Sequence, residues 1–209
     1  MPKISAFEKH FNLYEEWFEK NEYAYLSELD AVKLLMPKFE NGLEVGIGTG
    51  KFAVPLGINN GVEPSYEMRK IALERGLNVV DGVAENLPFE DNSFDLVLMV
   101  TTVCFVDDVL KSFKECFRVL KDSGIILIGF VDRESTIGKI YQENKEKSLF
   151  YKEATFFSTC EIVDFLYEAG FKDFNFSQTI FHTLDKIKEK EPAMHGFGKG
   201  SFITIKAKK

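Results

Sequence analysis

Short apolar segments alternate with amphipathic segments between residues 43 and 131, and this alternation restricts the possible fold more than any other feature of the chain. The apolar segments cover residues 43–47, a stretch ending at residue 63, and residues 77–80, 94–100 and 125–131. Between the last two, four apolar residues from Leu110 to Leu120 recur at helical spacing. Strands that alternate with amphipathic helices form right-handed βαβ units, so the sequence predicts a parallel sheet covered on both faces.

The segments that flank this region complete the expected architecture. Residues 1–37 predict two helices, the first with four aromatic residues from Phe7 to Phe18 at spacings of 4, 3 and 4, and the second ending before Pro37. Residues 132–157 show no clear period and are longer than a normal connection, which is typical of lids and binding loops. In residues 158–209, a capping box at residues 158–161 predicts a helix, and two consecutive strands predict an antiparallel pair.

We therefore expect one α/β domain over residues 1–209. Its predicted parts are N-terminal cap helices (1–37), a cofactor-binding core (41–131), a lid-like insert (132–157), and a C-terminal helix with an antiparallel strand pair (158–209). The expected sheet is Rossmann-like, doubly wound and mostly parallel, with seven strands and an antiparallel edge strand.

Composition excludes several classes of protein. The chain has 45% hydrophobic residues and a net charge of −7, so it is neither disordered nor typical of proteins that bind nucleic acid. Its longest apolar-plus-glycine run is seven residues, whereas a bilayer-spanning helix needs about 20. Three cysteines without a close pair, and no apolar leader, favour a reducing cytoplasm and argue against a disulfide scaffold or a zinc ribbon. We expect no metal, and the oligomeric state is not readable.

The most informative motif is the glycine-rich turn at residues 43–50, with the sequence LEVGIGTG. A strand that turns on glycines presents free backbone N–H groups and lets a ligand approach the main chain closely. Two familiar phosphate motifs do not match. A dinucleotide fingerprint needs glycine where Lys51 stands, and a Walker loop needs glycine at Val45 and Ser or Thr at Phe52.

A carboxylate at the end of the second predicted strand adds to this motif. Glu63 lies 17 residues after Gly46, where an acid can accept hydrogen bonds from both ribose hydroxyls of a nucleoside. The same residue could also be an exposed loop carboxylate. The segments DGVAENLPF at 81–89 and FRVLK at 117–121 follow at their own strand ends.

In this order and spacing, the motifs EVGIGTG at 44–50, GVEPS at 61–65, AENLPF at 84–89 and FRVLK at 117–121 resemble those of class I S-adenosylmethionine-dependent methyltransferases. The similarity is to the type 11 group, which includes the ubiquinone and menaquinone biosynthesis methyltransferases. It implies S-adenosyl-L-methionine as cofactor, a small-molecule methyl acceptor as partner, and direct displacement that releases S-adenosylhomocysteine.

The resemblance also implies roles for individual residues. Glycines of the turn surround the methionine part of the cofactor, Glu63 binds the ribose, and Pro64 and Met68 flank the adenine. Val83 stands where many relatives have an acid, which leaves adenine recognition to backbone groups or to Glu85. The full set of expected cofactor-binding residues is Glu44, Gly46, Ile47, Gly48, Gly50, Glu63, Pro64, Ser65, Met68, Val83, Ala84, Glu85, Thr101 and Thr102.

The catalytic group stays open, because methyl transfer from a sulfonium needs positioning and uses a base only for a protonated acceptor. Weak candidates are Asp132, Arg133, His182 and His195. Four aromatic residues are candidates for a substrate lid or, equally, for simple core packing: Tyr14, Trp17, Phe18 and Phe105. Two alternative functions are a non-catalytic cofactor sensor or assembly partner of the same fold, and a nicotinamide dehydrogenase with an unusual turn.

Overall fold

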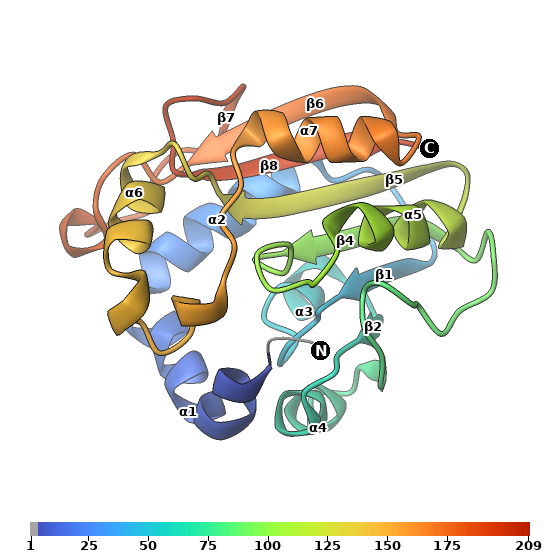
Figure 1. Ribbon diagram of the computed structural model, residues 1–209, viewed down its shortest axis with the longest axis horizontal. Helices are drawn as coiled ribbons and strands as arrows, with labels where there is room; N and C mark the ends of the chain where they lie inside the picture. The colour runs from blue at the N-terminus through green and yellow to red at the C-terminus, as the bar shows by residue number, and fades with distance from the viewer. Residues whose placement is uncertain (1–3) are drawn as a thin grey trace.

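One mixed sheet organises the molecule (Figure 1). The computed structural model describes residues 4–209, so the first three residues of the predicted cap lie outside it. Within that range, eight strands follow the order β3-β2-β1-β4-β5-β8-β6-β7. Their bounds are β1 Gly42–Val45, β2 Asn60–Val62, β3 Asn78–Val80, β4 Phe94–Val100, β5 Leu120–Val131, β6 Lys172–Thr179, β7 Met194–His195 and β8 Phe202–Lys208.

The sheet confirms the predicted mostly parallel arrangement. Strands β1 to β5 are all parallel to one another, whereas β8 is antiparallel to both β5 and β6. The expected antiparallel pair is therefore β6 and β8, with β8 inserted next to β5. The predicted number of strands was one too low for the part of the chain that the structure describes. The additional strand, β7, has only two residues and pairs with the outer edge of β6, which is too short to produce a periodic pattern.

Helices cover both faces of the sheet and begin where the sequence places caps. Ser65 caps α4, Asp108 caps α5, and Ser158 forms the predicted capping box with Glu161 at the start of α7. The helix bounds are α1 Ser5–Lys20, α2 Glu22–Leu35, α3 Ala53–Leu56, α4 Tyr66–Glu74, α5 Val109–Val119, α6 Thr136–Glu143 and α7 Thr159–Glu168.

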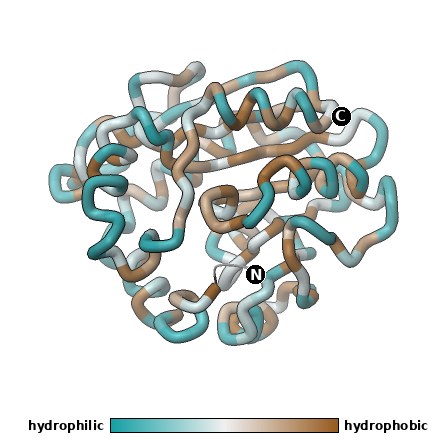
Figure 2. The backbone as a smooth tube through the Cα atoms, viewed as in Figure 1, coloured by the Kyte–Doolittle hydropathy of each residue, from teal (hydrophilic) through white to brown (hydrophobic). Residues whose placement is uncertain are grey.

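The core lies on the two faces of β4 and β5. Val97 and Met99 point to the face that packs against α5 and α7, and Leu96 and Leu98 point to the face that packs against α2. Figure 2 shows β5 as an apolar strand for most of its length, between helices with hydrophilic outer sides. Burial on both faces explains why these strands read as continuous apolar runs instead of alternating ones.

The segment after β5 is more ordered than its sequence suggested. It contains α6 and two 3₁₀ turns, η1 (Lys145–Lys147) and η2 (Tyr151–Glu153). Phe150 in this segment lies 5.2 Å, centroid to centroid, from Phe7 of α1. A Cβ at Gly138 would lie 2.0 Å from the carbonyl oxygen of Asp132, so glycine lets α6 fold back tightly against the end of β5.

Residues 4–209 contain neither a membrane-spanning helix nor a cluster of metal ligands. None of the helices there combines the length and the apolar character that crossing a bilayer requires. The same residues contain no group of three or more His, Cys, Asp or Glu side chains arranged to hold a metal ion.

Candidate active site

The glycine turn after β1 leaves its backbone open at the carboxyl end of the sheet. Gly46, Gly48 and Gly50 have φ of +69°, +56° and +87°, a region that side chains other than glycine rarely adopt. The N–H groups of Gly46 and Ile47 donate to the carbonyl oxygen of Val62, which fixes the turn to the end of β2. A Cβ at Gly46 would lie 2.5 Å from Cγ2 of Thr102. The turn is thus packed closely on its neighbours and cannot accept a side chain here.

Glu63 joins this turn to the start of α4. Its carboxylate accepts hydrogen bonds from the backbone N–H groups of Gly48 and Ser65, each at 2.9 Å. Only 7% of the residue is exposed, so it is not the exposed loop carboxylate that the sequence left open. Burial raises the pKa of Glu63 to about 7, against the opposing effect of the two N–H donors. The carboxylate lies at the end of β2 and lines a cavity.

Two further buried groups, Glu44 and Tyr14, interact with Glu63. Glu44 on β1 is buried, and its Oε2 has no hydrogen-bond partner. Burial and the nearby Glu63 raise the pKa of the Glu44 carboxyl. Burial, followed by Glu44 and Glu63, also raises the pKa of Tyr14 and keeps its phenol neutral. Arg69 is the cation that acts on Glu63, whereas no cation among residues 4–209 acts on the buried Glu44. An acidic pair of this kind favours a positively charged ligand and fits a sulfonium compound with an ammonium group.

Most of the predicted cofactor-binding residues line this one cavity. They are Gly46, Gly48, Glu63, Pro64, Met68, Val83, Ala84, Glu85, Thr101 and Thr102. The other four lie behind it: Glu44 and Ile47 are buried under the turn, Gly50 packs near Leu77, and Ser65 caps α4. Glu85 lines the cavity while its Oε1 accepts from the N–H groups of Asp107 and Asp108.

All four lid candidates line the same cavity, so they do more than fill the core. Tyr14, Trp17 and Phe18 come from α1 and Phe105 from the loop after β4. Gly82, which the resemblance places with Val83–Glu85 at the adenine edge, lines the cavity too. Sequence reasoning did not single out the remaining lining residues, which are Ile4, Phe7, Glu28, Phe52, Val62, Val100, Val106, Val131, Tyr141, Phe150 and Tyr151. A signal for Glu28 existed: it shares a helical face with the buried residues Ala24, Ala31 and Val32.

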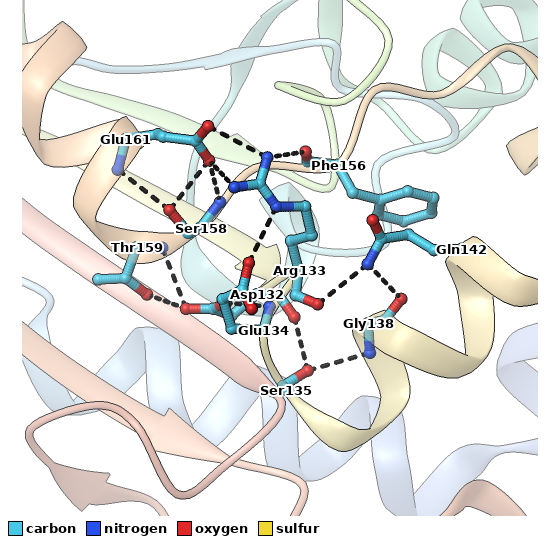
Figure 3. A network of polar contacts seen from close by, with 10 residues as sticks. All are labelled: Asp132, Arg133, Glu134, Ser135, Gly138, Gln142, Phe156, Ser158, Thr159 and Glu161. Carbon is cyan, nitrogen blue, oxygen red and sulfur yellow. Dashed lines mark hydrogen bonds and ion pairs between the residues drawn. The ribbon is translucent and has the colours of Figure 1, made fainter.

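The structure does not bring the four weak catalytic candidates to the cavity. Figure 3 shows Asp132 accepting from the backbone N–H of Thr159 at 3.0 Å and from that of Glu134 at 2.7 Å. Arg133 forms ion pairs with Glu134 and Glu161 at 3.1 and 2.8 Å. Both residues thus connect the end of β5 to the start of α7.

The two candidate histidines, His182 and His195, also lie outside the cavity. His182 is exposed, and its Nδ1 lies 2.5 Å from Oε1 of Glu191. His195 is exposed on β7 at the sheet edge. The chain turns outward after β5 because the N–H of Asp132 donates to Ser201 and that of Arg133 donates to Phe157. None of the four weak candidates therefore lines the cavity, and the catalytic group stays unassigned.

This position of Asp132 gives the first testable prediction. Asp132→Asn loses one acceptor of a buried network and should lower the free energy of unfolding by about 1–3 kcal/mol. For a chain of this size, that corresponds to a melting temperature lower by roughly 2–12 °C. Thermal melts followed by circular dichroism would measure it, with the exposed Asp122→Asn as control. Unchanged stability together with lost cofactor binding would contradict the structural role.

The raised pKa values predict a pH dependence of stability. Burial raises the pKa of Glu28 to about 8 and that of Glu63 to about 7, so the folded chain binds more protons than the unfolded chain between pH 5 and 8. The free energy of unfolding should therefore fall as pH rises through that window. Denaturant titrations at pH 5.5 and 8 should show a smaller difference for Glu28→Gln than for the unaltered chain. An equal difference would show that Glu28 does not titrate there.

Comparisons with known proteins agree with this geometry. A family model described as "Methyltransferase domain" matches residues 43–128. A crystal structure from Thermotoga maritima, described as a SAM-dependent methyltransferase and possible histamine N-methyltransferase, is 51% identical, with a TM-score of 0.97 and 99% of each chain covered. An uncharacterized protein of Methanocaldococcus jannaschii is 45% identical over 99% of this chain and 100% of its own length. The demethylmenaquinone methyltransferase of Staphylococcus aureus is 29% identical over 57% of this chain and 61% of its own.

The chain belongs to the class I S-adenosylmethionine-dependent methyltransferases of the type 11 group, as its motifs predicted. Its Rossmann-like fold and its cofactor, S-adenosyl-L-methionine, are likewise confirmed.

Proposed function

We propose that this chain transfers a methyl group to a small-molecule acceptor by direct displacement and releases S-adenosylhomocysteine. The observation that carries the proposal is the single cavity, which joins the glycine turn and Glu63 at one end to a set of aromatic side chains at the other. Bound S-adenosylmethionine supplies a methyl group on a sulfonium, which is already activated for displacement. The description of the Thermotoga protein, which names histamine N-methylation as possible, also supports a small acceptor.

In this proposal the protein mainly positions the two reactants and excludes water from the site. The turn at residues 46–50 and Glu63 hold the cofactor. Thr101 and Thr102 follow β4 and line the same cavity, and Thr102 lies against Gly46 of the turn. Tyr14, Trp17 and Phe105 cover the site with apolar surface and exclude water. Holding two reactants in line can lower a barrier by about 7–11 kcal/mol, so an additional catalytic group is needed only where the acceptor carries a proton.

The net charge of −7 favours a metabolite over a nucleic acid as acceptor. A non-catalytic cofactor sensor of the same fold remains the alternative function. The two are separated by titrating the protein with S-adenosylmethionine and then assaying S-adenosylhomocysteine formation with a panel of small amines, phenols, thiols and carboxylates. Turnover with any acceptor supports the enzyme. Tight binding with no turnover across the panel would support the sensor.

A further inference from the structure

Glu28 is a buried acid that lies outside the predicted set of cofactor-binding residues. It lies on α2, lines the cavity and is 7% exposed. Within residues 4–209, no hydrogen bond or ion pair engages its carboxylate. The buried side-chain oxygens there that are both sealed from solvent and unpartnered belong to Glu44 and Thr204, so the Glu28 oxygens remain accessible from the cavity. A nearly buried carboxylate that opens into a cavity without a partner points to a ligand.

The other two carboxylates that line the cavity differ from Glu28. Glu63 accepts from the N–H groups of Gly48 and Ser65, and Glu85 accepts from those of Asp107 and Asp108. These two acids are therefore partly satisfied by the backbone. Among the described lining residues there is no Lys, Arg or His that could neutralise the third. A cation that pairs with Glu28 in this cavity would therefore come from outside the chain.

The topology places Glu28 away from the expected nucleoside position. Glu63, Met68 and Val83 come from the half of the sheet that contains β2 and β3. Helix α2 instead packs on β5, β6 and β8, in the other half. The C-terminal ends of β4 and β5 point toward the side of the molecule where α1 and α6 lie (Figure 1). Glu28 thus lies on the side of the cavity away from the expected nucleoside, and we take this side as the acceptor end.

Aromatic rings surround this end. Tyr141 of α6 and Tyr151 of η2 stack with centroids 4.7 Å apart, and Tyr151 also stacks on Phe105 at 6.0 Å. Trp17 and Phe18 of α1 line the cavity as well. Aromatic faces attract cations, and the attraction grows when water is excluded. A lone carboxylate among aromatic rings is suited to a cation with a small apolar body.

We propose that Glu28 binds the ammonium group of a small amine, and that this amine is the methyl acceptor. The inference rests on the proposed methyltransferase function and adds the substrate class and the residue that recognises it. Glu28 also takes up the proton that blocks the nitrogen. One N–H bond of the ammonium would break, one O–H bond would form on Glu28, and the nitrogen would keep the electron pair. That pair would form the N–C bond to the methyl carbon while the C–S bond of S-adenosylmethionine breaks and leaves its electron pair on sulfur, giving S-adenosylhomocysteine. The methylated nitrogen is again positive, and Glu28 returns its proton to solvent.

Proton balance gives this proposal a distinctive signature. Burial raises the pKa of Glu28 to about 8. The titratable groups coupled to it are phenols, Tyr25 on its own helix and Tyr141 and Tyr151 across the cavity, and burial raises the pKa of each, so they stay neutral. At pH 7 the free carboxyl and the free amine therefore each hold a proton. When the amine is bound, its nitrogen and the Glu28 carboxylate together hold one proton fewer than the two free groups. One proton per chain should therefore be released on binding.

Calorimetry on protein saturated with S-adenosylhomocysteine tests the proposal. The probes are butylamine, 2-phenylethylamine and tryptamine, each paired with the alcohol that replaces its amino group. We expect at least one amine to bind about 10-fold or more tightly than its alcohol, with release of close to one proton when heats in phosphate and Tris buffers at pH 7 are compared. Glu28→Gln should weaken that amine about 10- to 150-fold and abolish the proton release.

The control is Glu22→Gln, which removes an exposed carboxylate from the same helix and should leave amine binding unchanged. Thermal melts establish that both variants fold. Amines that bind no better than their alcohols, fail to bind at all, or bind Glu28→Gln equally well would overturn the proposal. If S-adenosylhomocysteine binds while the amines do not, this inference fails and the proposed function stands. If S-adenosylhomocysteine itself does not bind, both fail.

Discussion

Gly46→Ala should abolish measurable binding of S-adenosylmethionine, a loss of at least about 100-fold. The backbone at Gly46 has φ +69°, and an added Cβ would lie 2.5 Å from Cγ2 and 2.6 Å from Oγ1 of Thr102. Either the turn or Thr102 must move, and both line the cavity. The left-handed conformation alone costs an alanine about 1–2 kcal/mol, so a lower melting temperature should accompany the loss of affinity. Isothermal titration calorimetry measures the binding, and circular dichroism measures the stability.

A second glycine, Gly57, separates the loss of cofactor affinity from the loss of stability. Gly57 has a similar φ of +72°, but a Cβ there would have no atom within 4 Å. Gly57→Ala should therefore lose similar stability through backbone strain while keeping full cofactor affinity. If Gly46→Ala also kept its affinity within about threefold, the turn would not be the cofactor cradle.

Glu63→Ala should weaken cofactor binding about 10- to 150-fold, the range for a hydrogen bond to a charged group. Two causes act in the same direction. The side chain that we expect to accept from the ribose hydroxyls is removed. The N–H groups of Gly48 and Ser65 also lose their acceptor, which loosens the turn. Glu74→Ala on the exposed side of α4 is the control and should bind normally.

A fluorescence measurement on the unaltered chain separates this account from a nicotinamide dehydrogenase. Reduced nicotinamide dinucleotide should show no fluorescence change on mixing with the unaltered chain. Unchanged affinity of Glu63→Ala for S-adenosylmethionine would show that the ribose does not lie at the end of β2.

Local patterns in the sequence predicted the parallel half of the fold and most of the residues that line one end of the cavity. Continuous apolar runs marked β4 and β5 because both faces of these strands are buried. The glycine turn and Glu63 could be read because their chemistry depends on short spacings within one βαβ unit. Ser65 and Ser158 were recognisable as helix caps for the same reason.

Features that depend on contacts between residues far apart in the sequence could not be predicted from local patterns. The period of α6 was hidden because the helix has only eight residues and includes Gly138, which is needed for its approach to Asp132. Asp132 follows a strand end, as site residues often do, yet its oxygens are engaged by Thr159, 27 residues later in the chain. Glu28 looked like one more charged helical residue, and only the packing of α2 against the sheet buries it.

A crystal structure with S-adenosylhomocysteine bound tests the central claim most directly. We expect the ribose hydroxyls within hydrogen-bonding distance of Glu63, the adenine between Pro64 and Met68, and the sulfur facing Thr101 and Thr102. Density for the ligand outside the cavity, or an empty cavity in crystals grown at saturating ligand, would contradict the account.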